Sequence, residues 1–422
     1  MKVALFYYDN PPEQGGVGHV LVCLMKLFNK TNHKIFFFNP YYKNEYTINI
    51  FEKRKYNIRN FLSKLKNKKY FKFVILILWK ILKDKKTKLS DRLKIILYFF
   101  VRPNIILNTI DNLIKIYFKI KKLGIDIILA GTATGDLLSL VFILSRMLNK
   151  KVASLTYGNE FLVHSRFSLR TYFFKNLDRL ILGTYTLKDL IKKIHHLDEN
   201  KLAVIFYGLI PEDYKISKSK EDLRKEFKIA QDQFVLLSVG RHVPRKSFDL
   251  VIKALKKIRE KEPTIKIKYY LIGEGEETQK LKNLTKNLGL EELVEFMGFT
   301  DTLTRNKFYK LSDLFVMPSI IQKESIEGFG IVYLEANYYK VPVIGTFSGG
   351  IVEAVINGET GFLIRENDVS DLVEKILYLY HNEDIRKLMG RKGYERVIQN
   401  FNWNLIINDY IKLFEDLLFE KR

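Results

Sequence analysis

Short hydrophobic runs separated by amphipathic segments form the main pattern of the first half of the chain. The hydrophobic runs predict strands at residues 2–8, 33–38, 125–130, 151–157, 179–185 and 201–208. The segments between them carry apolar residues at helical spacing, as in residues 17–29 and 135–148, and predict helices. Strands that alternate with helices indicate a mainly parallel sheet, because each helix carries the chain back before the next strand begins.

The second half repeats this alternation after a break. Residues 211–232 are polar and charged, and we interpret them as a linker that runs into a short helix. Further strands are predicted at residues 234–240, 267–273, 294–299, 313–319 and 341–346. A doubly wound α/β domain is the simplest interpretation of this series. From Asn400 onward the pattern is that of an amphipathic helix entered at Trp403.

The length of the chain decides how these two series are grouped. A chain of 422 residues is too long for one ordinary hydrophobic core, so two domains are expected. We place an N-terminal domain at residues 1–210 and a C-terminal domain at residues 211–400, and we expect a helix at residues 401–422 to pack back on the N-terminal domain. The single cysteine, Cys23, excludes a disulfide framework and suits a reducing compartment.

Positive charge is concentrated in one segment of the N-terminal domain. The formal net charge is +24, and 21 Lys or Arg residues against 4 acidic residues lie between Phe51 and Lys122. Apolar residues spaced among these lysines predict a basic amphipathic insertion at residues 51–122. Because no recognisable nucleic-acid motif is present, we expect an anionic membrane surface as the partner, and no nucleic acid. A solvated helical face over the N-terminal core is the alternative.

No segment of the sequence predicts a membrane span. The longest apolar stretch, Phe73–Trp79, is far shorter than the roughly 20 residues that a transmembrane helix needs. The N-terminal residues lack the long apolar region and the cleavage site of a signal peptide. We therefore expect a cytoplasmic protein, peripheral on the inner face of the cytoplasmic membrane.

Two cations follow the first predicted strand of the C-terminal domain. That strand ends at Gly240, and Arg241 and Lys246 lie in the loop before the next predicted helix. Ligands of open α/β sheets bind at the carboxyl ends of strands, and helix N-termini attract anions. The two cations therefore predict a diphosphate site, with a solvated basic loop as the alternative. A glycine turn containing Gly273 and Gly275 follows the next strand.

Two glutamates follow the strand predicted at residues 313–319. Glu327 begins a Glu-Gly-Phe-Gly sequence, and Glu335 lies further along the helix predicted after it. Their separation is slightly more than two helical turns, so we expect both carboxylates on nearly one face. Backbone N–H groups at the helix mouth favour phosphate oxygens, which leaves the carboxylates to hold neutral sugar hydroxyls. Two surface glutamates on an amphipathic helix are the alternative.

These segments resemble glycosyltransferase family 4, also described as glycosyl transferases group 1. The resemblance runs over nearly the whole chain, is most specific in residues 312–361 and is weak over residues 39–122. Members are retaining enzymes with the GT-B fold, in which two Rossmann-like, doubly wound domains face each other across a cleft. The resemblance thus implies a nucleotide-sugar donor held by the C-terminal domain and a glycan or lipid-linked acceptor held by the N-terminal domain.

The resemblance also implies roles for individual residues. Arg241 and Lys246 would bind the donor diphosphate, and together with Glu327 they would form the catalytic set. Glu327 would contact the donor sugar, and Glu335 the ribose hydroxyls. Further donor contacts would come from a glycine loop of the first domain, a turn by the nucleobase and the backbone at the helix mouth, which correspond to Gly15, Gly16, Phe299, Thr300, Gly328, Phe329, Gly330, Ile331 and Val332.

The acceptor side departs from the family pattern. Relatives carry His-Gly-x-Asp/Glu where this chain reads Tyr157-Gly-Asn-Glu160. The family histidine lies near the reacting carbon, whereas Tyr157 can donate a hydrogen bond but is not a cation at neutral pH. A milder departure is Ser247, which stands where a glycine is frequent after the diphosphate lysine.

The expected function is a metal-independent, retaining hexosyltransferase of bacterial surface polysaccharide or lipopolysaccharide assembly. The sequence contains no Asp-x-Asp triplet, which glycosyltransferases of the other main fold use to hold a metal. The charge of the leaving group would instead be met by Arg241, Lys246 and helix N–H groups, and no cofactor is expected. The alternatives are a related nucleotide-sugar enzyme, such as an epimerase or phosphorylase, and a non-enzymatic polyanion-binding protein.

Overall fold

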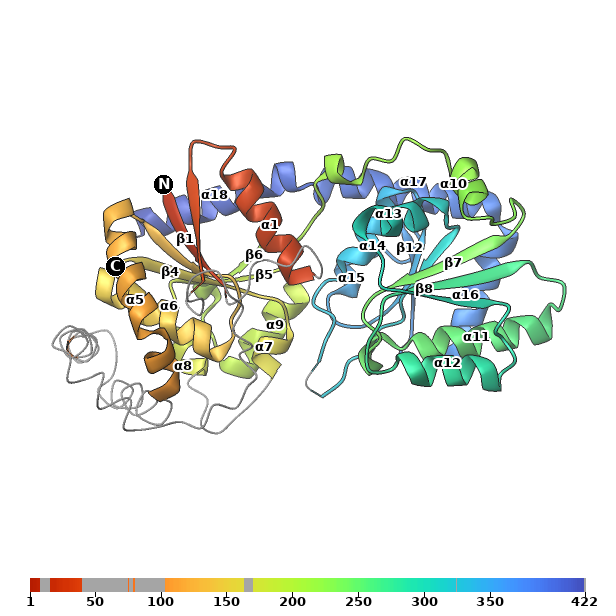
Figure 1. Ribbon diagram of the computed structural model, residues 1–422, viewed down its shortest axis with the longest axis horizontal. Coiled ribbons are helices and arrows are strands. Elements are labelled where there is room, and N and C mark those ends of the chain that lie inside the picture. The colour runs from red at the N-terminus through yellow and green to blue at the C-terminus, as the bar shows by residue number, and fades with distance from the viewer. Residues whose placement is uncertain are drawn as a thin grey trace. The chain divides into compact units, whose positions relative to one another are not determined.

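The computed structural model describes residues 1–7, 16–39, 75, 79, 103–162, 170–323 and 325–420. The prediction on Gly15 and most of those on the basic segment at residues 51–122 lie outside these residues. The chain divides into two compact units, each built on one parallel sheet (Figure 1). Unit 1 comprises Met1–Leu182, Lys188–Val204 and Ile407–Arg422, and unit 2 comprises Gly183–Leu187 and Ile205–Ile406.

The sheet of unit 1 has six parallel strands in the order β2-β1-β3-β4-β5-β6. They are β1 (Lys2–Phe6), β2 (Lys34–Phe38), β3 (Ile127–Ala130), β4 (Lys151–Thr156), β5 (Arg179–Leu182) and β6 (Leu202–Val204). Every residue of β3 and β4 is buried, as expected for central strands that helices cover on both faces. The strands predicted from the hydrophobic runs are thereby confirmed.

The helices of this part of the chain lie between those strands. They are α1 (Gly16–Phe28), α5 (Pro103–Leu123), α6 (Gly135–Leu148), α7 (Asn159–Leu162), α8 (Arg170–Asn176), α9 (Tyr185–His195) and the 3-10 turn η1 (Glu199–Lys201). Helix α6 has the predicted bounds, and it ends where Asn149 takes a left-handed conformation with φ 53°. An asparagine in this conformation is a common end of a helix, because its short polar side chain tolerates positive φ.

The sheet of unit 2 also has six parallel strands, in the order β12-β11-β10-β7-β8-β9. They are β7 (Phe234–Val239), β8 (Ile267–Ile272), β9 (Val294–Gly298), β10 (Leu314–Val316), β11 (Val343–Thr346) and β12 (Gly361–Ile364). The first five correspond to the predicted strands, and β12 was not predicted. All six residues of β7 are buried, which places this strand in the centre of the core.

Helices cover both faces of this second sheet (Figure 1). The helices and 3-10 turns are η2 (Pro211–Tyr214), α10 (Lys220–Glu226), η3 (Pro244–Lys246), α11 (Phe248–Lys261), α12 (Thr278–Asn287), α13 (Thr302–Leu311), α14 (Ile331–Tyr338), α15 (Ile351–Ala354), α16 (Val369–His381) and α17 (Glu383–Asn400). Helices α11, α12 and α16 lie on one face, and α10, α13, α14 and α17 on the other.

The strand order places a topological switch point between β7 and β10. From β7 the chain continues outward through β8 and β9, and then returns to the other side of β7 to add β10, β11 and β12. Loops that leave neighbouring strands at such a point diverge to opposite faces of the sheet and open a crevice at the carboxyl ends. The loops after β7 and β10 carry Arg241, Lys246 and Glu327, so the fold brings these predicted residues to its natural binding edge.

The last helix, α18 (Trp403–Phe419), belongs to unit 2 at its start and to unit 1 from Ile407 onward. Within unit 1, the ring of Phe414 lies 6.1 Å from that of Phe28 on α1, and Glu420 forms an ion pair with Arg179 on β5. The C-terminal part of α18 therefore packs in the core of unit 1, and Glu420, which follows it, contacts β5.

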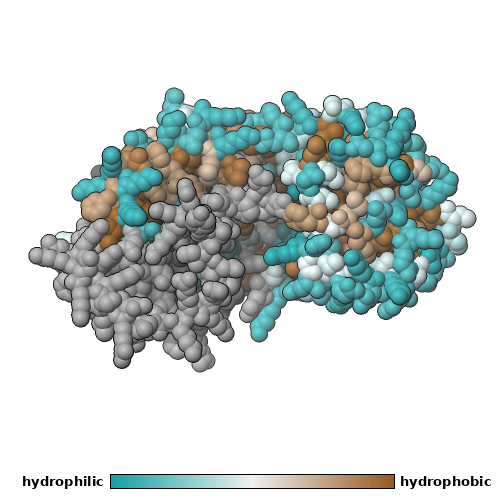
Figure 2. All heavy atoms as spheres, viewed as in Figure 1, coloured by the Kyte–Doolittle hydropathy of each residue, from teal (hydrophilic) through white to brown (hydrophobic). Residues whose placement is uncertain are grey.

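Hydrophobic and hydrophilic side chains are interspersed over the described surface that Figure 2 displays. Among the residues that the structure describes, no helix combines the length and the apolar character needed to cross a membrane.

Candidate functional site

The loop after β7 brings two cationic side chains together. The 3-10 turn η3 ends in Arg245 and Lys246, and Ser247 then takes a left-handed conformation with φ 48° before α11 begins. This left-handed conformation is one that glycine adopts without strain and that serine adopts less readily. The backbone oxygen of Arg245 accepts a hydrogen bond of 2.9 Å from Ile320 N, which ties this loop to the loop after β10.

The two cations converge on one carboxylate oxygen. Lys246 Nζ lies 2.6 Å from Glu327 Oε2, and Arg245 Nη1 forms an ion pair with the same oxygen. Each of the three side chains is only 11–12% exposed. Among the described residues, Glu327 Oε1 has no hydrogen-bond partner, so one oxygen is held while the other is available to a ligand.

The electrostatics keep this carboxylate ionised. Burial by itself would raise the pKa of Glu327, but the charges of Lys246 and Arg245 outweigh burial and lower that pKa to about 2. Burial lowers the pKa of Lys246, and the carboxylate of Glu327 opposes this effect. At neutral pH Glu327 is thus a hydrogen-bond acceptor and not a proton donor.

The helix mouth next to Glu327 is tightly built from glycines. Helix α14 begins after Gly330, which has φ 87°. A Cβ on Gly350 would lie 2.0 Å from Gly328 O, so only glycine permits this approach of the two backbones. Gly350 N donates to Glu327 O at 2.9 Å, and Thr184 Oγ1 donates to Gly328 O at 3.3 Å. The first turn of α14 therefore starts from a fixed loop.

The expectation that Glu327 and Glu335 share one helical face was wrong. Glu327 lies in the loop before α14, because the helix begins only at Ile331. Glu335 is buried on α14, where Tyr309 Oη donates to Oε2 at 2.8 Å and Tyr214 Oη donates to Oε1 at 2.9 Å. Glu335 thus has partners of its own, in η2 and α13.

The remaining predicted donor residues occupy three places in unit 2. Arg241 is exposed at the carboxyl end of β7. Phe299, at the end of β9, is 65% exposed, and the hydroxyl of Thr300 is buried next to it. Phe329 is buried just before α14, and Ile331 and Val332 form its first turn. The structure brings Lys246 to Glu327, while Arg241, Phe299 and Thr300 lie on neighbouring loops.

The predicted acceptor-side residues lie at the carboxyl end of β4 in unit 1. The carboxylate of Glu160 accepts hydrogen bonds from Tyr157 N at 3.1 Å, Gly158 N at 2.9 Å and Thr132 Oγ1 at 2.9 Å. These contacts fix the turn in which Tyr157 lies. Gly16, predicted on the donor side, is exposed at the start of α1.

The prediction from sequence missed Arg245. Arg245 stands in a Pro-Arg-Lys-Ser sequence. Lys246 was expected to bind the diphosphate, and Arg245 was given no role. In the structure Arg245 lies in the 3-10 turn η3, and its side chain forms an ion pair with Glu327. The signal available in the sequence was the presence of two adjacent cations after one strand.

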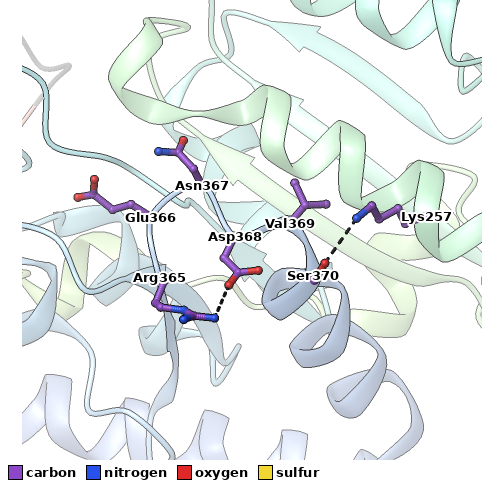
Figure 3. Close-up of a pocket in the computed structure, with 7 residues that line it drawn as sticks. All are labelled: Lys257, Arg365, Glu366, Asn367, Asp368, Val369 and Ser370. Carbon is purple, nitrogen blue, oxygen red and sulfur yellow. Dashed lines mark hydrogen bonds and ion pairs between the residues drawn. The ribbon is translucent and has the colours of Figure 1, made fainter.

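A polar pocket lies at the carboxyl end of β12, where the chain enters α16 (Figure 3). Its charged groups are engaged with one another, because Arg365 pairs with Asp368 at 2.9 Å and Lys257 Nζ lies 3.5 Å from Ser370 Oγ. Asp368 also caps α16 by accepting from Asp371 N at 2.9 Å. These contacts give the polar side chains of the lining partners without a ligand. None of the predicted site residues lines this pocket.

Solved structures share the fold of this chain. The Anabaena protein Alr3699/HepE, solved in complex with UDP and glucose, matches with a TM-score of 0.71 and 18% identity over 99% of this chain and 100% of its own. The predicted fold class is confirmed: this is a GT-B fold, made of two units that each have a six-stranded parallel sheet with flanking helices.

Sequence comparisons identify the family. The family described as "Glycosyl transferases group 1" matches residues 219–396. An uncharacterized glycosyltransferase of Methanocaldococcus jannaschii is 32% identical over 269 residues, or 62% of this chain and 67% of its own length. The N-acetyl-alpha-D-glucosaminyl L-malate synthase of Bacillus anthracis is 31% identical over 230 residues, which span 54% of this chain and 58% of that relative. The chain belongs to the glycosyl transferases group 1 family.

Proposed function

We propose that this protein is a retaining glycosyltransferase that moves a hexosyl group from a nucleoside-diphosphate sugar to a glycan or lipid-linked acceptor. The observation that carries the proposal is the carboxylate of Glu327, of which one oxygen is held by Lys246 and Arg245 and the other is available. A buried, ionised acceptor of this kind suits a sugar hydroxyl, and it lies at the mouth of α14, where backbone N–H groups suit phosphate.

The proposed roles of the site residues follow from their charges. Arg245, Lys246 and Glu327 together carry one excess positive charge in a buried place, and Arg241 adds another at the end of β7. A donor diphosphate would balance this excess. As the bond between sugar and phosphate breaks, negative charge builds up on the leaving diphosphate, and cations and N–H groups already in position stabilise it. Glu335 is proposed to contact the ribose hydroxyls of the donor.

Retention of configuration is proposed to follow from attack on the same face of the sugar from which the nucleotide leaves. The leaving phosphate then takes the proton of the acceptor hydroxyl, so no protein base is needed. This agrees with the lowered pKa of Glu327, a weak base that is held on one oxygen by two cations.

We also propose that catalysis needs no divalent metal. The proposal is based on Arg241, Lys246 and the N–H groups of α14, which supply positive potential where the diphosphate would lie. Full activity in EDTA is the expected result. Activity that is lost in EDTA and restored by Mg²⁺ or Mn²⁺ would contradict this part of the proposal.

The acceptor is proposed to be part of a bacterial surface polysaccharide or lipopolysaccharide assembled at the inner face of the cytoplasmic membrane. The support is the concentration of positive charge at residues 51–122, which suits a lipid-linked substrate at an anionic surface.

The test of the proposed function is a thermal-stabilisation screen with UDP-, GDP- and ADP-sugars. A ligand that binds only the native state raises the melting temperature, so one nucleotide class should stabilise the protein. Arg241→Ala and Lys246→Ala should reduce that stabilisation, whereas Lys253→Ala, an exposed residue of α11 paired with Asp249, should leave it unchanged. Equal stabilisation of the two site variants and the control would remove the diphosphate assignment.

A further inference from the structure

His242, the residue after Arg241, is completely buried although it lies in the loop that leaves β7 at the binding edge. Its ring lies against two aromatic rings, with centroids 5.6 Å from Phe248 and 6.4 Å from Phe296 in edge-on arrangements. A titratable side chain is thus held inside the core, one residue after Arg241, which is proposed to bind the diphosphate.

A hydrogen-bond chain connects this ring to the start of α12. Thr278 Oγ1 accepts from Gly275 N at 2.9 Å and lies 2.9 Å from His242 Nδ1. Thr278 Oγ1 can donate its own hydrogen to Nδ1 while it accepts from Gly275 N, which corresponds to the tautomer with Nδ1 as acceptor and the proton on Nε2. Burial, with a smaller contribution from Lys282, lowers the pKa of His242 to about 4, so the ring is neutral at ordinary pH.

The backbone of His242 binds the same turn from both sides. His242 N donates to Glu274 O at 3.0 Å, and Glu277 N donates to His242 O at 3.0 Å. A Cβ on Gly275 would lie 2.3 Å from His242 O, so the turn after β8 approaches this residue as closely as only glycine allows. The ring and the backbone of His242 therefore both join the loop after β7 to the turn after β8.

The arrangement leaves one polar atom without a partner. His242 Nε2 is buried, and no other described residue hydrogen-bonds to it. A buried polar atom without a partner destabilises a fold, because its hydrogen bonds to water are lost and not replaced. An apolar ring would fill the same space without this cost, but it would lose the contact of Nδ1 with Thr278.

We propose that His242 is a positioning residue for donor binding, which fixes the loop after β7 through Thr278 and the Gly273–Gly275 turn so that Arg241 is presented to the diphosphate. This inference rests on the proposed function, because it assumes a diphosphate ligand at that loop. A locked loop binds its ligand more tightly, since the entropy of ordering has already been lost before binding.

The test uses two pairs of variants, each with one change that removes the contact and one that keeps it. Thr278→Val removes the hydroxyl at nearly constant shape, and Thr278→Ser retains it. His242→Phe keeps an aromatic ring but loses the acceptor, and His242→Asn keeps a polar atom at the position of Nδ1. UDP, GDP and ADP are titrated calorimetrically into the unaltered full chain, and the one that binds most tightly is then used with every variant.

The expected result is a dissociation constant about tenfold weaker, roughly 1.4 kcal/mol, in Thr278→Val and His242→Phe, and nearly unchanged in Thr278→Ser. With a donor sugar, KM should rise while kcat changes little. The double variant should bind no more weakly than Thr278→Val alone, because that change already breaks the contact that His242→Phe removes. His242→Asn should recover part of the loss.

Two other results would overturn the inference, and they differ from each other. If unaltered protein binds a nucleotide but folded Thr278→Val and His242→Phe bind it equally well, the positioning role is wrong and the proposed function stands. If no nucleotide binds the unaltered protein and no donor sugar is consumed, the proposed function fails and the inference fails with it. Should His242→Phe not fold, the comparison of Thr278→Val with Thr278→Ser decides alone.

Discussion

At the scale of single residues, the two glutamates of the proposed donor site have different surroundings. Glu327 is held by two cations at the binding edge. Glu335 is held inside unit 2 by two tyrosine hydroxyls, and Arg305 Nη2 lies 3.5 Å from its Oε1. We therefore expect Glu327→Gln to lower kcat most, since Glu327 is the residue proposed to contact the donor sugar. Glu335→Gln should mainly raise the KM for the donor. Steady-state kinetics decide between them, and unchanged kcat and KM in both variants would contradict the assignment.

The lowered pKa of Glu327 gives a prediction about stability and pH. A carboxyl whose pKa is about 2 in the folded chain, against an ordinary value of 4.5, stabilises the fold when ionised. This contribution is complete above the ordinary value and is lost as the pH falls from there toward 2. The difference in free energy of unfolding between unaltered protein and Glu327→Gln should therefore shrink over that interval.

Urea denaturation at several pH values measures this difference. Glu359→Gln, a change at an exposed residue that lies 3.6 Å from Lys392, is the control and should show little difference at any pH. If the difference in free energy of unfolding between unaltered protein and Glu327→Gln stays constant down to pH 2, the ion pairs of Glu327 with Lys246 and Arg245 do not form.

The identity of the site residues could be predicted from sequence better than their contacts. Lys246 and Glu327 were expected on one edge because both follow strands of a parallel sheet, and the structure brings them together. Arg245 was missed because the direction of a loop side chain depends on its own backbone and side-chain torsions, which the sequence pattern does not reveal. The contacts of Glu335 with Tyr214 and Tyr309 join segments that are far apart in the chain, and no local sequence pattern predicts such contacts.

At the scale of elements, strand order determines the site more than any single loop does. The alternation of strands and helices predicted both sheets, but β12 escaped notice because a turn, and not a helix, directly precedes it. The start of α14 was placed too early, since Glu327-Gly-Phe-Gly has no feature that separates a loop from a helix end. In both cases tertiary contacts decide the boundary, and a local pattern does not contain them.

The Gly273–Gly275 turn provides a prediction at this scale. In Gly275→Ala the new methyl group would lie 2.3 Å from His242 O, so the backbone must shift, at a cost of about 1–3 kcal/mol. Gly358→Ala is the control, because that position has positive φ but no atom within 4 Å. We expect Gly275→Ala to weaken nucleotide binding and Gly358→Ala to leave it intact. Equal nucleotide affinity in both variants would show that the turn is not part of the donor site.

At the scale of the whole molecule, the distribution of charge suggests where the enzyme works. The segment between Phe51 and Lys122 contains most of the net charge of +24, mixed with apolar residues such as Phe71, Phe73, Leu76, Trp79 and Leu82. Each basic residue near an anionic surface contributes on the order of 1 kcal/mol, so several together hold a protein reversibly. We propose that this segment docks the protein on an anionic membrane.

Vesicle sedimentation tests the docking proposal. Binding is expected to anionic vesicles at low salt, to weaken as ionic strength rises, and to be absent with neutral lipid. Replacing Lys68, Lys69, Lys72 and Lys80 together with Gln should reduce it, and four similar changes at exposed lysines of unit 2 serve as the matched control: Lys253, Lys257, Lys280 and Lys387. No binding at low salt, or equal loss in both sets, would point to a soluble sugar as acceptor.

Proton NMR of a donor sugar in real time, in the presence of the protein, tests directly whether the protein is a retaining glycosyltransferase. The donor is the one that stabilises the protein best. If the protein is a retaining glycosyltransferase with its donor site in unit 2, the nucleoside diphosphate is released, and the first sugar product, transferred or hydrolysed, has the anomeric configuration of the donor. Glu327→Gln and Lys246→Ala should slow this reaction strongly. A donor that is bound but never cleaved, or a first product of the opposite anomeric configuration, would contradict the account.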